Sequence, residues 1–148
     1  MGSGVTAIAG TPIVAGPARG EAMTTNEPLS LWGGLNPATG EIIDRRHPLS
    51  GRVVTGRVLV LPHGRGSCSA SGVLLESIRN GTAPAAVVVS RLDPIIGLGA
   101  ILAEELYGQT IPVVLVSSDD SRAIGDGDFV EVSVDGRLAV AHGVGRGA

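Results

Sequence analysis

Glycine and proline are concentrated in the first third of the chain, and this constrains the fold more than any other feature of the sequence. Within residues 16–51 they recur at short intervals, as Pro17, Gly20, Pro28, Gly33, Gly34, Pro37, Gly40, Pro48 and Gly51. Proline removes a backbone donor and glycine weakens a helix, so this segment cannot form a long helix. We predict short strands and turns here, and long loops of this kind usually serve a site or an interface.

Beyond this segment, aliphatic runs alternate with stretches of helical spacing. Residues 53–61 and 85–89 predict buried strands, and 111–116 predicts a third. Between them, the apolar positions of 73–78 predict a helix that Asn80-Gly81 ends, and 98–107 predicts a second helix closed by Gly108. Strand and helix in alternation favour right-handed crossovers onto a parallel sheet.

The two ends of the chain are expected to add β structure to this sheet. Residues 129–134 and 138–141 flank Asp135-Gly136, a pair typical of a β-hairpin turn. Residues 13–15 could form a short strand, whereas residues 1–12 are weakly patterned and are expected to be partly disordered. The fold class is therefore α/β, in a single domain over residues 1–148, with a central parallel sheet and added hairpin structure.

Composition excludes several classes of partner. The chain has 148 residues with a formal net charge of −3, only three aromatic residues and no lysine, which argues against a nucleic-acid groove. The longest apolar run, 94–103, is far short of the roughly 20 residues that a membrane helix needs. The N-terminal stretch also lacks the basic region of a signal peptide, so we expect a cytoplasmic protein.

The chain has a single cysteine, Cys68. One cysteine excludes an internal disulfide and cannot by itself hold an iron–sulfur cluster or a structural zinc, so any cluster must come from another chain. His47, His63 and His142 have neither helical pairing nor an acid nearby in the sequence. They are expected to be loop or surface histidines and not metal ligands.

The feature with most chemical content is the glycine-rich turn after the strand at 53–61. Gly64 and Gly66 precede Ser67 and Ser69, and a helix follows. Successive backbone N–H groups at such a turn can form an anion site, which also stabilises the deprotonated form of a serine. The alternative is that the serines are only helix caps.

Two better-known motifs are incomplete at this turn. A dinucleotide fingerprint needs a third glycine where Ser69 stands, although Asp93 could serve as its ribose ligand. A Ser-His-Asp hydrolase needs Gly-x-Ser-x-Gly, whereas residues 65–69 read Arg-Gly-Ser-Cys-Ser.

Several short segments resemble the small subunit, or swivel domain, of the aconitase X family. They are 29–34 (LSLWGG), 39–44 (TGEIID), 47–51 (HPLSG), Pro62 with 64–67 (GRGS), and 81–86 (GTAPAA). The resemblance extends from about residue 14 to residue 116. It implies a swivelling β/β/α domain that closes over a larger catalytic subunit carrying an iron–sulfur cluster, with no cofactor on this chain.

The resemblance also implies the chemistry. In aconitase-like enzymes a serine at this turn removes the proton α to a carboxylate while the cluster iron takes the leaving hydroxyl, and Ser67 is the matching position. The implied substrate-binding residues are the rest of the turn together with the Trp-Gly-Gly loop: Gly64, Arg65, Gly66, Cys68, Ser69, Gly33 and Gly34. Ordinary aconitase has Ser-Arg-Glu after the glycine, so its substrate-binding arginine is missing here, and Arg65 is a hypothetical replacement.

Family activities are the dehydration of cis-3-hydroxy-L-proline in bacteria and of mevalonate 5-phosphate in archaea. The composition, rich in alanine and with arginine as its only basic residue besides histidine, resembles that of a GC-rich bacterium and so favours the former. A second hypothesis comes from residues 97–106, 111–113, 124–128 and 134–136, which resemble the phosphohistidine domain of phosphoenolpyruvate-utilising enzymes. Leu98 stands in place of the histidine, so a shared fold without that chemistry is implied. A third hypothesis is a structural or regulatory subunit, in which Ser67 only caps its helix.

Overall fold

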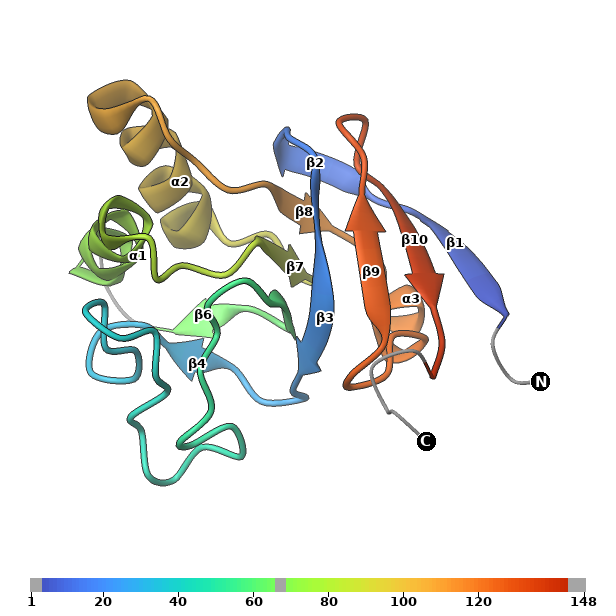
Figure 1. Ribbon diagram of the computed structural model, residues 1–148, viewed down its shortest axis with the longest axis horizontal. Coiled ribbons are helices and arrows are strands. Elements are labelled where there is room, and N and C mark those ends of the chain that lie inside the picture. Colours follow the sequence, from blue (N-terminus) through green and yellow to red (C-terminus); the bar gives the residue numbers. More distant parts are fainter. Residues whose placement is uncertain (1–3, 66–68, 144–148) are drawn as a thin grey trace.

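The computed structural model describes residues 4–65 and 69–143 (Figure 1). Its strands and helices, in chain order, are β1 (Val5–Ala9), β2 (Thr11–Val14), β3 (Ala18–Thr24), β4 (Leu29–Ser30), β5 (Val58–Leu61), β6 (Gly64–Arg65), α1 (Ser69–Asn80), β7 (Ala86–Val89), α2 (Pro94–Tyr107), β8 (Val113–Leu115), α3 (Ser118–Arg122), β9 (Phe129–Val132) and β10 (Arg137–Ala141).

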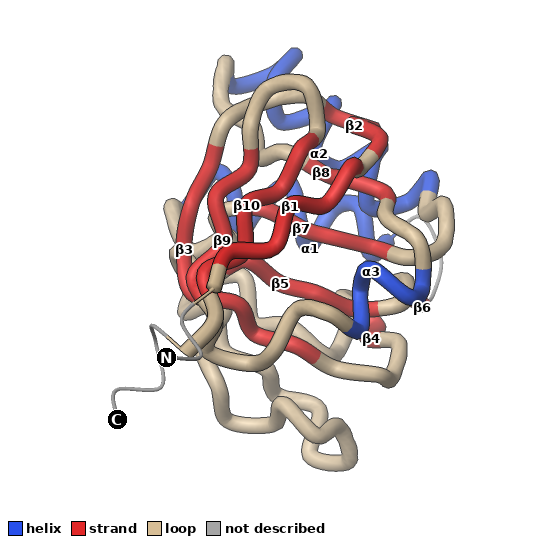
Figure 2. Tube along the Cα trace, turned by 90° about the vertical axis from the view of Figure 1, so that its right-hand side faces the viewer, coloured by secondary structure: helices blue, strands red, loops and turns tan. Residues whose placement is uncertain are grey.

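Eight strands form one mixed sheet in the order β1-β10-β9-β3-β5-β7-β8-β2. Its centre, β3 to β8, is parallel, and the remaining pairs are antiparallel. Only Gly10 separates β1 from β2, although these strands stand at opposite ends of the sheet order, so the sheet must curl back on itself. Figure 2 shows the result, with β1, β10 and β9 in front of β5 and β7.

The curled sheet has a hydrophobic core on each of its faces. In β5, Val58 and Val60 point inside the curl, whereas Leu59 and Leu61 face α1 and α2. All four residues of β5 and of β7 are aliphatic and buried, as expected for parallel strands that are covered on both faces. The layers are therefore sheet, sheet and helices, which confirms the expected β/β/α architecture (Figure 1).

The breaker-rich segment contains no helix, as predicted. Between β4 and β5 the chain forms turns joined by isolated bridges, Leu35 with Ile42 and Glu41 with Val53. Five of its aliphatic side chains are buried in the helix-side core: Leu31, Leu35, Ile42, Leu49 and Val54. The segment is thus an irregular but packed covering of the sheet.

Several predicted boundaries differ from the structure. Strand β5 begins at Val58 and not at residue 53, because Gly56 adopts a φ of 74° and turns the chain. Helix α2 begins at Pro94, four residues before the predicted start at Leu98. The signal that could have located this start is Asp93-Pro94, an N-cap residue followed by a proline suited to the first helical turn.

The two ends of the chain both add strands to the sheet, as expected, but the N-terminal strands begin earlier than predicted. Residues 1–12 were expected to be partly disordered, whereas the structure contains β1 and β2 from Val5 onwards. Strand β1 pairs with β10, a contact that no local pattern announces. The C-terminal hairpin is confirmed: β9 and β10 pair antiparallel around Asp135-Gly136, where Gly136 has a φ of 90°.

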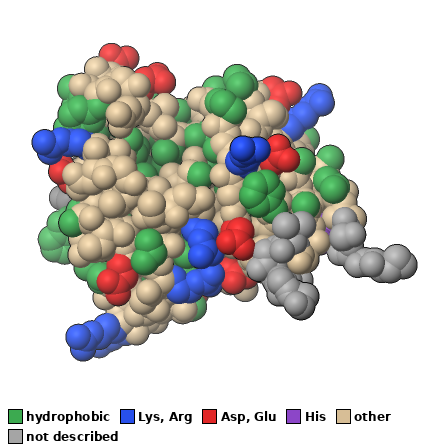
Figure 3. All heavy atoms as spheres, viewed as in Figure 1, with side chains coloured by type: hydrophobic (Ala, Val, Ile, Leu, Met, Phe, Trp, Pro, Cys, Tyr) green, Lys and Arg blue, Asp and Glu red, His purple; other side chains and the backbone are tan. Residues whose placement is uncertain are grey.

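Within residues 4–65 and 69–143, no helix is long and apolar enough to cross a membrane. On the face shown in Figure 3, acidic and basic side chains lie next to one another. This mixture fits the small net charge of −3.

Candidate functional site

The structure brings together the two segments that the sequence singled out. Strands β4 and β6 form a two-stranded parallel ladder in which Leu29 pairs with Gly64 and Ser30 pairs with Arg65. The Trp-Gly-Gly loop continues directly from β4, and the glycine-rich turn continues directly from β6. Both therefore leave the same short ladder (Figure 1).

Gly66, Ser67 and Cys68 lie outside the described residues, but both of their flanks are described. Arg65 ends β6, and Ser69 begins the 12-residue helix α1. The turn thus connects a strand to the N-terminus of a helix, as predicted, and the first N–H groups of such a helix have no partner within it. Two residues into α1, the hydroxyl of Ser71 donates to the carbonyl of Ile95 at 2.9 Å, which ties this end of α1 to α2.

Gly64 is held by a carboxylate of the same chain. Its N–H donates to Oδ2 of Asp93 at 2.5 Å, while Oδ1 of Asp93 accepts from the N–H groups of Ile95 and Ile96 at 3.0 and 3.1 Å. Asp93 is therefore the N-cap of α2 and is 7% exposed. The sequence offered it as a ribose ligand, but its oxygens are already engaged. The N–H of Gly64 is likewise occupied, so an anion site must use N–H groups further along the turn.

Glycine is also the residue that fits at position 64. A Cβ added there would lie 2.9 Å from Oδ2 of Asp93 and 3.2 Å from Cδ1 of Ile96. The absence of a side chain lets β6 approach the start of α2 closely enough to form the hydrogen bond to Asp93.

Two local causes account for the Trp-Gly-Gly loop. Gly33 has a φ of 80°, which favours glycine, and a Cβ on Gly34 would collide with the carbonyl oxygen of Ser30. Between β4 and these glycines, Trp32 is 65% exposed. A large apolar side chain exposed beside the ladder is suited to contact with another molecule.

A second set of contacts joins the segments that follow β5 and β7. The carbonyl of Pro62 accepts from the N–H groups of Ser90 and Arg91 at 3.2 and 3.1 Å. One step further, Nη1 of Arg91 donates to Nε2 of His63 at 3.2 Å, and Nδ1 of His63 lies 2.5 Å from the carbonyl oxygen of Gly64. The carbonyl can only accept, so Nδ1 carries the proton, and Nε2 is free to accept from the guanidinium.

A cavity of about 310 Å³ opens beside these contacts, at the carboxyl ends of the parallel strands. This is the edge at which open α/β sheets commonly bind ligands. Its lining is mostly polar and comes from the segments after β3, β5 and β7 and from α3: Thr25, Asn26, Pro62, Ser90, Ser118, Ser121 and Arg122. The sequence singled out none of these residues as site residues, because their proximity depends on the sheet order.

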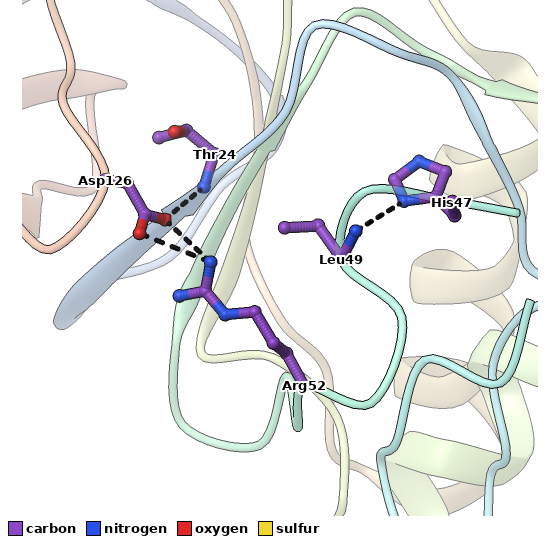
Figure 4. A network of polar contacts seen from close by, with 5 residues as sticks. All are labelled: Thr24, His47, Leu49, Arg52 and Asp126. Atoms are coloured by element: carbon purple, nitrogen blue, oxygen red, sulfur yellow. Dashed lines mark hydrogen bonds and ion pairs between the residues drawn. The ribbon is translucent and has the colours of Figure 1, made fainter. Parts of the chain in front are cut away.

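The three histidines have more specific surroundings than predicted. His47 lies in a loop, as expected, but its side chain is buried, with 7% exposed. Its Nδ1 accepts from the N–H of Leu49 at 3.1 Å (Figure 4). His142 has an acid as its neighbour in space: its Nδ1 lies 2.8 Å from Oδ2 of the buried Asp128, and its Nε2 lies 2.6 Å from Oγ1 of Thr6.

The breaker-rich loop between β4 and β5 is also bonded to the end of the curled sheet at which the parallel strands finish. In Figure 4, the guanidinium of Arg52 contacts the carboxylate of Asp126 at 3.2 Å, and this carboxylate accepts from the N–H of Thr24 at 3.0 Å. The loop that carries His47 is therefore connected to the end of β3, on the same edge as the cavity. Among the described residues, no three histidine, cysteine or acidic side chains lie close enough to hold a metal ion.

Comparison with known proteins identifies relatives over most of the chain. The family model described as the aconitase X swivel domain matches residues 7–140. A cis-3-hydroxy-L-proline dehydratase of Pseudomonas aeruginosa is 54% identical over 101 residues, which cover 68% of this chain and 17% of that protein. A phosphomevalonate dehydratase small subunit of Methanothermobacter thermautotrophicus is 42% identical over 120 residues, which cover 81% of this chain and 86% of that subunit.

A solved structure shares the fold. The crystal structure of Thermococcus kodakaraensis aconitase X in its holo-form superposes with a TM-score of 0.83 at 32% identity, covering 93% of this chain and 99% of that one. The chain thus spans about a fifth of the length of the hydroxyproline dehydratases that it matches, at 17% and 21%, but most of the archaeal small subunit.

Proposed function

Because the chain belongs to the aconitase X swivel domain family, we propose that it acts as the small, swivelling component of a two-component dehydratase, with Ser67 as the base. The observation that carries the proposal is the family match over residues 7–140 across the turn that leads from β6 into α1. Ser67 stands in this turn by sequence. The proposed partner is a large aconitase X subunit.

The proposed substrate is cis-3-hydroxy-L-proline, which would be converted to pyrroline-2-carboxylate. Its support is the 54% identity to the Pseudomonas dehydratase, against 42% to the archaeal small subunit. The alternative substrate is mevalonate 5-phosphate, because relatives with that name are small subunits that the match covers almost completely. Both substrates carry a carboxylate and a hydroxyl that leaves as water.

The chemistry assigned to this chain is the removal of a proton. The oxygen of Ser67 would take the proton from the carbon α to the carboxylate. The C–H electron pair would form the new double bond as the hydroxyl on the neighbouring carbon departs, and one proton from solvent would complete the water molecule, which balances the proton that Ser67 takes and later returns to solvent. For serine to act as a base its alkoxide must be stabilised, and N–H groups after Gly64 at the start of α1 are the donors available for this.

An iron–sulfur cluster, which would assist departure of the hydroxyl, is assigned to the partner. The described residues offer no ligand set for it, and Cys68 is the only cysteine of the chain. The roles of Arg65, Gly66, Cys68 and Ser69 in substrate binding remain part of the proposal, as do those of Gly33 and Gly34. The glycines at 33 and 34 are already required by their backbone geometry.

The test is reconstitution with a large aconitase X subunit, followed by a pair of serine variants. We expect the chain alone to be colourless and inactive, and the complex to dehydrate cis-3-hydroxy-L-proline. Ser67→Ala should preserve folding and assembly and lower kcat by about 10²–10⁴-fold, the usual loss when a general base is removed. Ser69→Ala is the comparison variant: it removes a hydroxyl two residues away and should lower kcat much less, because a residue that only stabilises the helix end or contacts the substrate does not take the proton.

The outcomes distinguish a catalytic from a structural role of the chain. The opposite ranking of the two variants would move the base to Ser69. If both variants lower the melting temperature and neither changes turnover, the serines are caps and the chain only closes the site. Turnover by the purified chain without a partner would exclude a two-component enzyme, and selective turnover of mevalonate 5-phosphate would establish the alternative substrate.

A further inference from the structure

We infer that Arg91 is the residue of this domain that binds the substrate carboxylate, and that His63 is its positioning residue. The inference rests on the proposed function. Arg91 follows β7, and His63 stands between β5 and β6. The contact of 3.2 Å between the two side chains places a guanidinium against the residue that directly precedes β6, the strand from which the chain enters the glycine-rich turn.

The charge of Arg91 distinguishes it from two other arginines at this edge of the sheet. Arg122 is paired with Asp119, and Arg52 is paired with Asp126. Arg91 instead contacts an imidazole, and no carboxylate of the described residues lies within ion-pair distance of it. No carboxylate of the described residues therefore offsets the positive charge of its exposed guanidinium.

The nearest carboxylate in sequence cannot take that role without breaking other bonds. Asp93, two residues after Arg91, accepts from the N–H groups of Gly64, Ile95 and Ile96. Breaking these bonds would release β6 from α2 and remove the cap of the helix. Asp93 therefore remains hydrogen-bonded to these backbone N–H groups, and Arg91 can bind the carboxylate of a ligand.

His63 orients the guanidinium of Arg91 without offsetting its positive charge. Because its Nδ1–H faces the carbonyl of Gly64, its Nε2 presents a lone pair to one N–H of Arg91. A carboxylate in this position would hold the arginine equally well but would cancel its charge. A guanidinium has five N–H donors, so the contact with His63 leaves enough of them for a bidentate bond to a carboxylate.

The position of the pair also fits a small substrate. Pro62 and Ser90, which line the cavity of about 310 Å³, immediately precede His63 and Arg91 and are joined by a backbone hydrogen bond of 3.2 Å. This volume lies at the lower end of the range of about 300–1,000 Å³ typical of ligand pockets, as a small hydroxy acid requires. The structure thus provides a cation, held by His63, that directly follows a residue lining a polar cavity.

The test is steady-state kinetics and calorimetry on the complex with the large subunit, using cis-3-hydroxy-L-proline. We expect Arg91→Gln to raise KM and the calorimetric Kd by about 10–100-fold, with kcat changing less than about threefold, because a carboxylate contact made equally in the ground and transition states affects binding alone. Arg91→Lys, which keeps the charge but loses the fork, should lie in between.

Two further variants test the role of His63 and the specificity of the effect. His63→Leu should raise KM, and His63→Gln, which restores an acceptor for Arg91, should recover part of the loss. Arg79→Gln is the matched control and should behave as wild type. Arg79 pairs with Glu76 near the end of α1 remote from the turn.

The results distinguish this inference from the proposed function. Unchanged KM and Kd in Arg91→Gln, in a complex that still turns over, would overturn the role of Arg91 and leave Ser67 as the base. The same large effect in Arg65→Gln alone would transfer the role to Arg65. Loss of assembly in Arg91→Gln would make Arg91 an interface residue, which also overturns the inference. A wild-type complex that neither binds nor converts cis-3-hydroxy-L-proline or mevalonate 5-phosphate would refute the proposed function, and the inference with it.

Discussion

Replacing Asp93 should loosen the glycine-rich turn and destabilise the domain by a calculable amount. This buried side chain makes two kinds of contact: it caps α2 through Ile95 and Ile96, and it accepts the N–H of Gly64 from another element. Asp93→Ala removes both. The cap is worth about 1 kcal/mol. The partly buried N–H of Gly64 would lose its acceptor, and a buried donor in that state costs about 1–3 kcal/mol.

The expected total for Asp93→Ala is therefore about 2–4 kcal/mol. In a domain of this size each kcal/mol lowers the melting temperature by about 2–4 °C, so the shift should be of order 10 °C. Asp93→Asn should fall between wild type and alanine. Its single carbonyl oxygen can still cap α2, but its NH₂ group then faces the N–H of Gly64, donor to donor.

Thermal unfolding of the purified chain, together with amide hydrogen exchange at Gly64, measures both contributions. Ser117→Ala is the control, because it removes an exposed cap of α3 without leaving a buried donor, and it should lower the melting temperature by only about 2–4 °C. Exchange at Gly64 should accelerate in both Asp93 variants and not in Ser117→Ala. If Asp93→Asn matches wild type in stability and exchange, the bond to Gly64 contributes nothing and the reasoning is refuted.

Two further predictions concern the loop and the hairpin. Amide exchange over residues 29–51 should slow when the large subunit binds, because the exposed Trp32 is expected to line that contact; protection confined to other segments would exclude this interface. In the hairpin, the hydroxyl of Ser133 donates to Asp135 at 2.6 Å and, as the main cause, lowers the pKa of that carboxyl below 3.8. The carboxylate's contribution to stability is therefore complete above pH 3.8 and lost as pH falls through the lowered pKa. Ser133→Ala should move the pKa of Asp135 back towards 3.8 in an NMR titration, and an unchanged value would assign the shift to Arg137 instead.

The features that could be predicted from sequence are those set by neighbours along the chain. Gly81 and Gly108 follow the two long helices in the left-handed conformation that lets a helix end, and Asp135-Gly136 turns the C-terminal hairpin. The start of α2 was predictable in the same way from Asp93-Pro94 but was placed four residues late. Each of these features depends on the backbone preferences of a few consecutive residues.

The residues of the candidate site also fall into two groups, those that local sequence identifies and those that it does not. Ser67 and the strand–turn–helix around it were identified from consecutive residues and from the family resemblance. Neither Arg91 nor the cavity residues on α3 were, because nothing in their local sequence distinguishes them from surface polar residues. Their proximity arises from β5 lying beside β7 in the sheet and from α3 lying at the ends of the parallel strands.

By itself, then, the sequence determined the two long helices, the strands between them, the C-terminal hairpin and the breaker-rich loop that cannot become a helix. Only the tertiary structure decided that β1 and β2 occupy opposite ends of one curled sheet, that β4 pairs with β6, and that Asp93 reaches Gly64 from 29 residues away. The physical reason is that local patterns record which face of an element is apolar, not which distant element will cover it. That choice depends on how all the apolar faces can be buried and all the buried donors satisfied at the same time.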